Sequence, residues 1–188
     1  CDIDKNKAMQ TAEKHQCEYC TEFNDIINNN DIDVVHILTP HYLHAPMAIS
    51  AMEAGKHVLT EKPMATSVLD AVKMIETSNT ADKKLGVCFQ NRYNKTSGII
   101  KKKLCTKEVG EITGIKGMLT WFREENYYRQ SDWRGRWETE GGGVLINQAI
   151  HTLDLLQWFV GDIDEIKATV DTRMLKDVIE VEDTAEAT

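Results

Sequence analysis

The sequence lacks the long apolar runs and the excess of basic residues that mark membrane and nucleic-acid-binding proteins. No apolar stretch approaches the roughly 20 residues that a membrane-spanning helix needs. The formal net charge is −8, which argues against nucleic acid or an anionic membrane surface as a partner. With 41% apolar and 28% charged residues, the 188-residue chain has the composition of a soluble globular protein. Its length suffices for one full domain or parts of two.

The cysteines offer neither a complete metal site nor a disulfide framework. Cys17 and Cys20 form a CEYC pair with His15 close by, but a structural zinc ion needs four ligands and no second pair follows. A zinc-binding module is therefore the weakest interpretation, and we predict no metal site. The odd count of five cysteines fits reduced thiols, so we expect the protein to reside in the cytoplasm.

The first ninety or so residues alternate between strand and helix patterns. Short apolar runs that end in polar residues predict buried parallel strands at 33–40, 56–63 and 84–93. Helical spacing predicts helices at 43–55 and 67–82, with Ser67 as a cap of the second, after two short helices at 5–15 and 20–29. This order is typical of a right-handed parallel α/β sheet, which we assign to residues 1–93.

The pattern changes after residue 93. A helix is expected over 95–110, closed by Gly110, and three later stretches alternate between apolar and polar residues. These stretches, at 111–124, 164–175 and 179–188, predict strands with one solvated face. We therefore expect residues 94–188 to form an α+β domain with an open, mainly antiparallel sheet.

Polar residues follow each predicted parallel strand, in the segments LTPHYLH, LTEKP and CFQNRY. Ligands of open α/β sheets bind outside these carboxyl ends. Lys62 has little freedom there, because Pro63 biases it towards an extended backbone. A partly desolvated lysine at that place can point at a substrate hydroxyl. An exposed loop lysine paired with Glu61 explains the same residues equally well.

Asp2 stands where an acidic residue could bond ribose hydroxyls, although a surface aspartate is the commoner explanation.

A second candidate site lies in the stretch GGGVLINQAIHTLDLL, 141–156. Because helical residues advance by about 100° each, Asn147, His151 and Asp154 fall on one stripe of an otherwise apolar helix. Buried polar groups cost free energy unless they are paired. They could pair with one another or with a neighbouring strand, or they could face a cleft, which we favour. The upstream pair Trp133 and Arg134 offers a stacking face and a cation, or simply anchors a surface loop.

Taken together, these motifs resemble the Gfo/Idh/MocA oxidoreductase family. The segment VVHILTPHYLHAPMAISAMEAGKHVLTEKPMA is similar to the TP-x-x-x-H and AGKHV-x-x-EKP core of the family, and EGGGVLINQAIHTLDLLQWFVG to its second signature. The resemblance implies an N-terminal Rossmann domain and a C-terminal α/β domain. It implies hydride transfer between NAD, or NADP as the alternative, and a hydroxyl-bearing carbon of a sugar, sugar derivative or cyclitol. A non-catalytic sugar-binding or scaffolding relative is the competing interpretation. The resemblance also implies a homo-oligomer formed through the C-terminal sheet.

The resemblance assigns roles to particular residues. The catalytic residues are Lys62, His151 and Asn147. The cofactor side is lined by Asp2, Thr39, Pro40, His44, Glu61, Lys62 and Gln90. The substrate is bound by Lys62, Arg92, Trp133, Arg134, Asn147, Asp154 and His151. Asn147 departs from the family, which frequently has an aspartate there, so Lys62 and His151 must carry the proton transfer. Asp2 favours NAD, because a carboxylate repels a 2′-phosphate.

Two features at the ends of the chain lead to a further expectation. The glycine-rich turn that binds the pyrophosphate of a dinucleotide is missing, and the sequence begins with Cys1. The final residues, VEDTAEAT, stop within an alternating pattern. We therefore expect an internal piece of a longer enzyme, truncated at both ends, which by itself binds NAD poorly and is weakly active or inactive.

Overall fold

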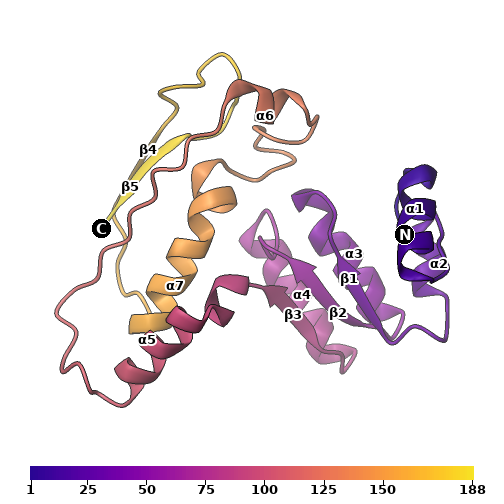
Figure 1. Cartoon of the computed structure of the whole chain (residues 1–188), viewed down its shortest axis with the longest axis horizontal. Helices are drawn as coiled ribbons and strands as arrows, with labels where there is room; N and C mark the ends of the chain where they lie inside the picture. Colours follow the sequence, from indigo (N-terminus) through magenta and orange to yellow (C-terminus); the bar gives the residue numbers. More distant parts are fainter.

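In the computed structural model, which describes residues 1–188, the N-terminal half is a parallel sheet with the strand order β1-β2-β3. The strands are β1 (Val34–Ile37), β2 (His57–Glu61) and β3 (Leu85–Cys88). The connecting helices are α3 (His41–Glu53) and α4 (Val68–Thr80), and α1 (Lys5–His15) and α2 (Phe23–Ile27) precede the sheet at one end of the molecule (Figure 1). The parallel α/β prediction is confirmed, including the cap of α4, where the Ser67 hydroxyl accepts the Asp70 N–H at 3.1 Å.

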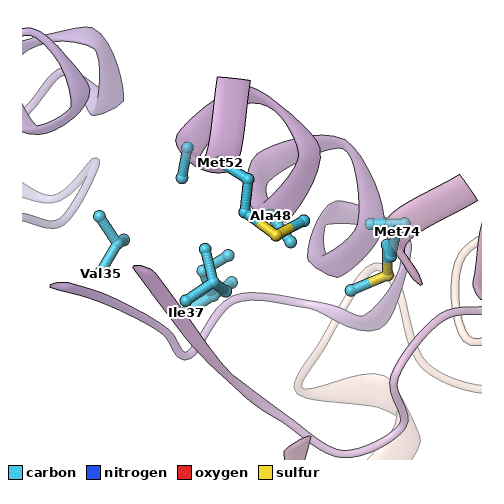
Figure 2. Close-up of a cluster of buried hydrophobic side chains, with 8 residues drawn as sticks. Val35, Ile37, Ala48, Met52 and Met74 are labelled. Carbon is cyan, nitrogen blue, oxygen red and sulfur yellow. The ribbon is translucent and has the colours of Figure 1, made fainter. Parts of the chain in front are cut away.

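The core of this half lies between the sheet and its two covering helices. Alternate residues of β1, Val35 and Ile37, turn their side chains towards α3, which presents Ala48 and Met52 (Figure 2). Met74 from α4 completes the cluster. Burying each of the larger side chains stabilises the fold by roughly 1.5–3 kcal/mol. Since α3 presents small alanines to the sheet, the helix can pack closely and hold its N-terminal end at the carboxyl end of β1.

The C-terminal half is built around one helix with an irregular start. A 3₁₀ turn, η1 (Gln90–Tyr93), leads into α5 (Lys95–Cys105), which packs against α7 (Ile150–Val160). A π-helical turn, η2 (Leu145–Ala149), runs directly into α7, and a short helix, α6 (Glu125–Arg129), lies beyond it (Figure 1). β4 (Ala168–Asp171) and β5 (Thr184–Ala187) pair antiparallel. None of the helices has the length and apolar character to cross a bilayer.

The strand expected over 111–124 is absent from this sheet, which contains two strands only. The segment passes close to α7, because a Cβ at Gly117 would lie 2.6 Å from the side chain of Thr152. Apolar side chains such as Ile112, Ile115 and Met118 stay largely exposed along it. Alternation predicts a backbone with two unlike faces, but a strand also needs a neighbour that completes its hydrogen bonds. The domain boundary at residues 93 and 94 stays a prediction.

Candidate active site

The carboxyl ends of β1 and β2 meet a loop of the C-terminal half at an open cleft of about 330 Å³. The loop contributes Trp133 and Arg134, which therefore face residues that are some seventy positions or more away in the sequence. The cleft is lined by Leu38, Thr39, Pro40, His41, His44, Glu61, Lys62, Trp133 and Arg134. The structure thus brings together most of the residues expected on the cofactor side and three of those expected to bind the substrate, with Lys62 expected in both roles.

Lys62 joins the two halves of the molecule. Its Nζ donates a hydrogen bond to the backbone oxygen of Asn147 at 2.8 Å. Glu61 forms no ion pair with this ammonium, since its carboxylate accepts the backbone N–H of Lys62 at 3.2 Å instead. Burial lowers the pKa of Lys62 below its usual value, which the charges of Glu61 and Glu140 partly offset. The lysine is therefore held at the site and can release its proton more readily than a surface lysine.

His151 lies one helical turn beyond Asn147, half-buried at the start of α7. Its Nδ1 is buried and makes no hydrogen bond within the chain. Burial first, and then the nearby charge of Lys62, lowers the pKa of His151. The imidazole is therefore neutral at neutral pH and can accept a proton from a ligand.

The side chain of Asn147 binds a buried acid that sequence reasoning missed. Its Nδ2 donates to Glu140 Oε1 at 2.5 Å and to the Tyr127 hydroxyl at 3.2 Å. Glu140 is fully buried, and its other carboxylate oxygen accepts the Gly135 N–H at 2.5 Å. Burial raises the pKa of Glu140, against the effect of these two donors. The available signal was the position of Glu140, directly before the three glycines.

His41 is a second residue that sequence reasoning missed, although it stands in the quoted LTPHYLH segment. It is buried at the start of α3, and its Nδ1 donates to the backbone oxygen of Glu140 at 2.9 Å. Burial lowers the pKa of His41 to about 4. Its ring lies 4.7 Å from that of Trp133, centroid to centroid. His41 therefore ties the end of the parallel sheet to the loop that carries the cation and the tryptophan.

His44 and Thr39 shape the cofactor side of the cleft. The buried His44 ring bridges two loops, with Nδ1 2.7 Å from the Pro63 oxygen and Nε2 2.8 Å from the Thr39 oxygen. It holds the segments after β1 and β2 in place. The Thr39 hydroxyl is buried without a hydrogen-bond partner. A buried polar atom of this kind is costly unless something binds it, so Thr39 is available to a ligand in the cleft.

Close backbone contact explains the glycines before η2. A Cβ at Gly143 would lie 1.8 Å from the backbone oxygen of Glu182, and one at Gly141, whose φ is +83°, would lie 2.7 Å from Thr66 Cβ. The Glu182 carboxylate accepts the N–H groups of Gly143 at 2.9 Å and Leu145 at 3.1 Å. These contacts fix the start of the helical segment that carries Asn147 and His151.

Comparison with known proteins agrees with this geometry. Residues 1–89 match the model of an oxidoreductase family with an NAD-binding Rossmann fold, and residues 99–188 match the GFO/IDH/MocA C-terminal domain. The chain belongs to the Gfo/Idh/MocA oxidoreductase family. The predicted family and fold class are thereby confirmed.

Three relatives illustrate the range of the family. Levoglucosan dehydrogenase of Pseudarthrobacter phenanthrenivorans is 30% identical over 88% of this chain and 43% of its own length. The 1-carboxy-3-chloro-3,4-dihydroxycyclohexa-1,5-diene dehydrogenase of Comamonas testosteroni is 33% identical over 72% of this chain and 34% of its own. The WlbA dehydrogenase of Chromobacterium violaceum, solved with NADH and UDP-GlcNAcA, is 36% identical with a TM-score of 0.91, over 100% of this chain and 53% of that one. The chain therefore spans about half the length of these family members or less.

Arg92 and Asp154 were both expected to bind the substrate, but in this structure they bind each other. Arg92, from η1, donates from Nε to Asp154 Oδ2 at 2.8 Å and from its terminal nitrogen to Oδ1 at 2.5 Å. This pairing raises the pKa of Arg92. Asp154 is buried in α7, so the bond fastens the end of the parallel sheet to that helix. Of the predicted stripe, Asn147 and Asp154 thus have separate partners, whereas His151 has none within the chain. A substrate contact of Arg92 or Asp154 stays a prediction.

Asp2 and Gln90 lie outside the cleft. Both are exposed, and neither is among the residues that line it. Asp2 accepts the backbone N–H of Asp4 at 2.8 Å, next to the start of α1. The prediction that Asp2 and Gln90 bind the cofactor therefore rests on the family resemblance, and no contact in the structure supports it.

An aromatic and cationic stack borders the cleft on the C-terminal side. The guanidinium of Arg134 lies 4.6 Å from the ring centre of Trp133 and 4.7 Å from that of Tyr127. Arg123 lies 4.8 Å from Tyr127 and from Trp121. The Nε atoms of both arginines are buried without a hydrogen-bond partner, and neither arginine forms an ion pair. Two oriented guanidiniums are thus left available to an acceptor.

Proposed function

We propose that the protein is an NAD-dependent oxidoreductase that oxidises a hydroxyl-bearing carbon of a sugar, sugar derivative or cyclitol. The observation that carries this proposal is the position of Lys62. It lies at the carboxyl end of β2, beside the expected cofactor cleft, and is bonded to the backbone of Asn147 near the unpaired His151. A proton acceptor thus stands next to a cleft that suits a nicotinamide.

The cleft fits the cofactor side of such an enzyme. It opens at the carboxyl ends of β1 and β2, and its walls include Thr39, Pro40, Glu61 and Lys62. The unpaired hydroxyl of Thr39 is a group that a bound cofactor would satisfy. When bound, NAD supplies the hydride acceptor. We keep NAD as the proposed cofactor and NADP as the alternative, since the position of Asp2 relative to the cleft does not decide between them.

The residues of this chain handle the proton of the substrate hydroxyl. In the proposed step the hydroxyl lies between Lys62 Nζ and the His151 imidazole. The C–H bond breaks and its hydrogen leaves with the electron pair as hydride. The O–H proton passes to His151, and a C=O bond forms. The lowered pKa of His151 keeps its imidazole neutral and able to accept the proton, and the lowered pKa of Lys62 brings that group closer to neutrality. Lys62 keeps its place through its hydrogen bond to the Asn147 carbonyl.

We further propose that the substrate carries an anionic group. Arg123 and Arg134 present buried Nε atoms without partners, and neither forms an ion pair with a carboxylate. A carboxylate or phosphate would satisfy both the charge and the hydrogen bonds. Two relatives support this choice, since one is named for a carboxylated cyclic diol and the other was solved with UDP-GlcNAcA. An exchange of Arg134 for Lys should raise KM for an anionic substrate far more than for a neutral one.

We also propose that the protein acts in the cytoplasm as a homo-oligomer formed through the C-terminal sheet. Five free cysteines support a reducing compartment. The exposed apolar residues Ile115, Met118 and Val170, on and beside the sheet, support an interface there. Sedimentation of the protein and of a Val170→Glu variant tests the second point. An unchanged mass in the variant would contradict it.

The test of the activity is an assay of nicotinamide reduction at 340 nm with the full-length protein and a panel of sugars, sugar acids and cyclitols. Lys62→Met should lower kcat/KM by about 10³-fold, because it removes the group that holds the reacting hydroxyl. Lys73→Met, at an exposed position of α4, is the matched control and should leave the rate unchanged. Equal activity of Lys62→Met and the wild type would refute the proposal. Tight binding of a sugar by the wild type without any turnover would also refute it.

A further inference from the structure

The three buried carboxylates of the chain have different kinds of partner. Asp154 is paired with the guanidinium of Arg92, and Glu182 accepts backbone N–H groups at the start of η2. Like Glu182, Glu140 has no bonded cation, and it is the most deeply buried of the three, with 0% of its surface exposed. Burying an ionised carboxylate without a bonded cation costs several kcal/mol. Its position therefore calls for a role other than stability.

The partners of Glu140 lead to the reacting groups. Oε1 accepts from the side chain of Asn147, and the backbone oxygen of Asn147 accepts from Lys62 Nζ. Because a carboxylate bonds only to the amide nitrogen, Glu140 decides which way the amide points. The amide oxygen is turned away from it and makes no hydrogen bond within the chain, so it can accept a hydroxyl of the substrate.

The charges around this chain of contacts define the electrostatic role of Glu140. Arg134 and Lys62 face the carboxylate, with the phenol of Tyr128 close by. Lys62 in turn faces Glu61 and Glu140 as anions, and Arg123 and Arg134 as cations. The histidines at 41 and 151 also lie near Lys62. Glu61 and Glu140 are thus the two negative charges that oppose the effect of burial on the lysine.

We propose that Glu140 is a positioning residue of the reaction: its carboxylate orients the Asn147 amide and supplies negative charge to the Lys62 ammonium across the interface of the two halves. This inference rests on the proposed function for its kinetic readout. The contacts that carry it come from the fold alone, so the coupling of Glu140 to Lys62 is also measurable without turnover.

The first experiment is the pH profile of kcat/KM for Glu140→Gln in the full-length protein. Removing the negative charge lowers the pKa of Lys62, so the limb that Lys62 governs moves to lower pH. We expect the rate at neutral pH to fall about 10- to 100-fold, because the Asn147 amide loses its fixed orientation. Glu138→Gln is the matched control: Glu138 is exposed, two residues away in the same segment, and should leave both profile and rate unchanged.

A charge exchange separates positioning from simple loss of structure. Asn147→Asp alone sets two carboxylates at the 2.5 Å contact, so we expect it to be at least as harmful as Glu140→Gln. The double variant, Glu140→Gln with Asn147→Asp, restores one amide and one carboxylate with their positions exchanged. It should recover to within about tenfold of the wild-type rate, a strong departure from the product of the single effects. Additive losses in the double variant would overturn the proposal.

The last experiment tests this inference independently of the proposed function. The titration of Lys62 is followed by ¹⁵N NMR of the full-length protein, with Lys62→Arg identifying its signal. The Lys62 pKa should fall in Glu140→Gln and stay at its wild-type value in Glu138→Gln. Such a shift in a protein that lacks any sugar oxidation would refute the proposed activity and keep the coupling. An unchanged titration, with catalysis intact, would refute the role of Glu140.

Discussion

The two halves of the molecule are stabilised in different ways. The parallel-sheet half has a cluster of eight buried apolar residues between its strands and helices, whereas the cluster around Tyr128 in the other half has four. All three buried carboxylates lie in that second half, at positions 140, 154 and 182. The first half therefore depends on packing, and the second on satisfied polar contacts, several of which reach across to the first.

The difference shows how the active site is assembled. Lys62 comes from a strand end that a close-packed core holds rigid, and the groups it meets come from a polar network around η2. The close-packed half fixes the position of Lys62, and the polar half forms directional hydrogen bonds to that residue. Substitutions should therefore act differently in the two halves.

The largest effect is expected from the apolar core. Met52→Ala removes a fully buried side chain between α3 and the sheet and should lower the free energy of unfolding by about 4 kcal/mol. Urea denaturation measures this loss. Met9→Ala, at an exposed position of α1, should change the stability by less than about 0.5 kcal/mol. A loss at Met52 no larger than at Met9 would mean that packing does not dominate the first half.

In the polar half, a backbone contact is expected to be nearly as sensitive. Gly143→Ala places a methyl group 1.8 Å from the Glu182 oxygen and should cost about 3 kcal/mol as the backbone shifts. Gly98→Ala, inside α5 with open space around it, should instead stabilise the protein by roughly 0.5–1 kcal/mol. Thermal unfolding of the pair provides the comparison, and similar melting temperatures would contradict the close contact at Gly143.

The contact between the halves at His41 should make stability depend on pH. The pKa of His41 is about 4 in the folded protein and 6.5 in the unfolded chain. Between these values the unfolded chain binds more protons, so stability falls as pH falls from 6.5 towards 4. The loss approaches about 3 kcal/mol at the lower end. His41→Asn keeps a donor near the Glu140 oxygen but cannot titrate, so its stability should decline less over this range in urea titrations. Parallel pH curves for the two proteins would contradict this.

The smallest effect is expected from the ion pair between the halves. Asp154→Asn removes the charge that both Arg92 nitrogens meet and should cost roughly 1–2 kcal/mol, since 38% of the arginine side chain stays solvated. Glu165→Gln breaks an exposed pair with Lys167 and should cost less than about 0.5 kcal/mol. Chemical denaturation at low and high salt distinguishes them, because only the exposed pair is readily screened.

Much of the fold followed from local patterns. Apolar runs bounded by Pro40 and Pro63 predicted the parallel strands, and the spacing of α3 and α4 predicted the helices between them. Those signals are local, because each strand and helix buries its own periodic face. The segment 111–124 shows where this reasoning failed: its alternation was real, but a strand requires a hydrogen-bonded neighbour, which no local pattern reveals.

The candidate site was predicted in part for the same reason. Lys62 and Trp133, two of the predicted site residues, line the cleft, and their roles there stay predictions. The stripe of 147, 151 and 154 was derived for a regular α-helix, whereas η2 is a π-helical turn. Asn147 and Asp154 bind different neighbours, and His151 is left without a hydrogen-bond partner. Glu140 and His41 were missed because their partners lie far away in the sequence.

By itself, the sequence determined which segments form the parallel sheet, which residue types end its strands and which family the chain belongs to. These properties depend on periodicity and on short motifs, both of which involve residues that are close together in the sequence. Only the tertiary structure decided that Lys62 binds the Asn147 backbone, that Arg92 takes both oxygens of Asp154, and that Glu140 stands behind the Asn147 amide. Hydrogen bonds across distant segments need positions set within tenths of an ångström, and only the packing of both halves sets them.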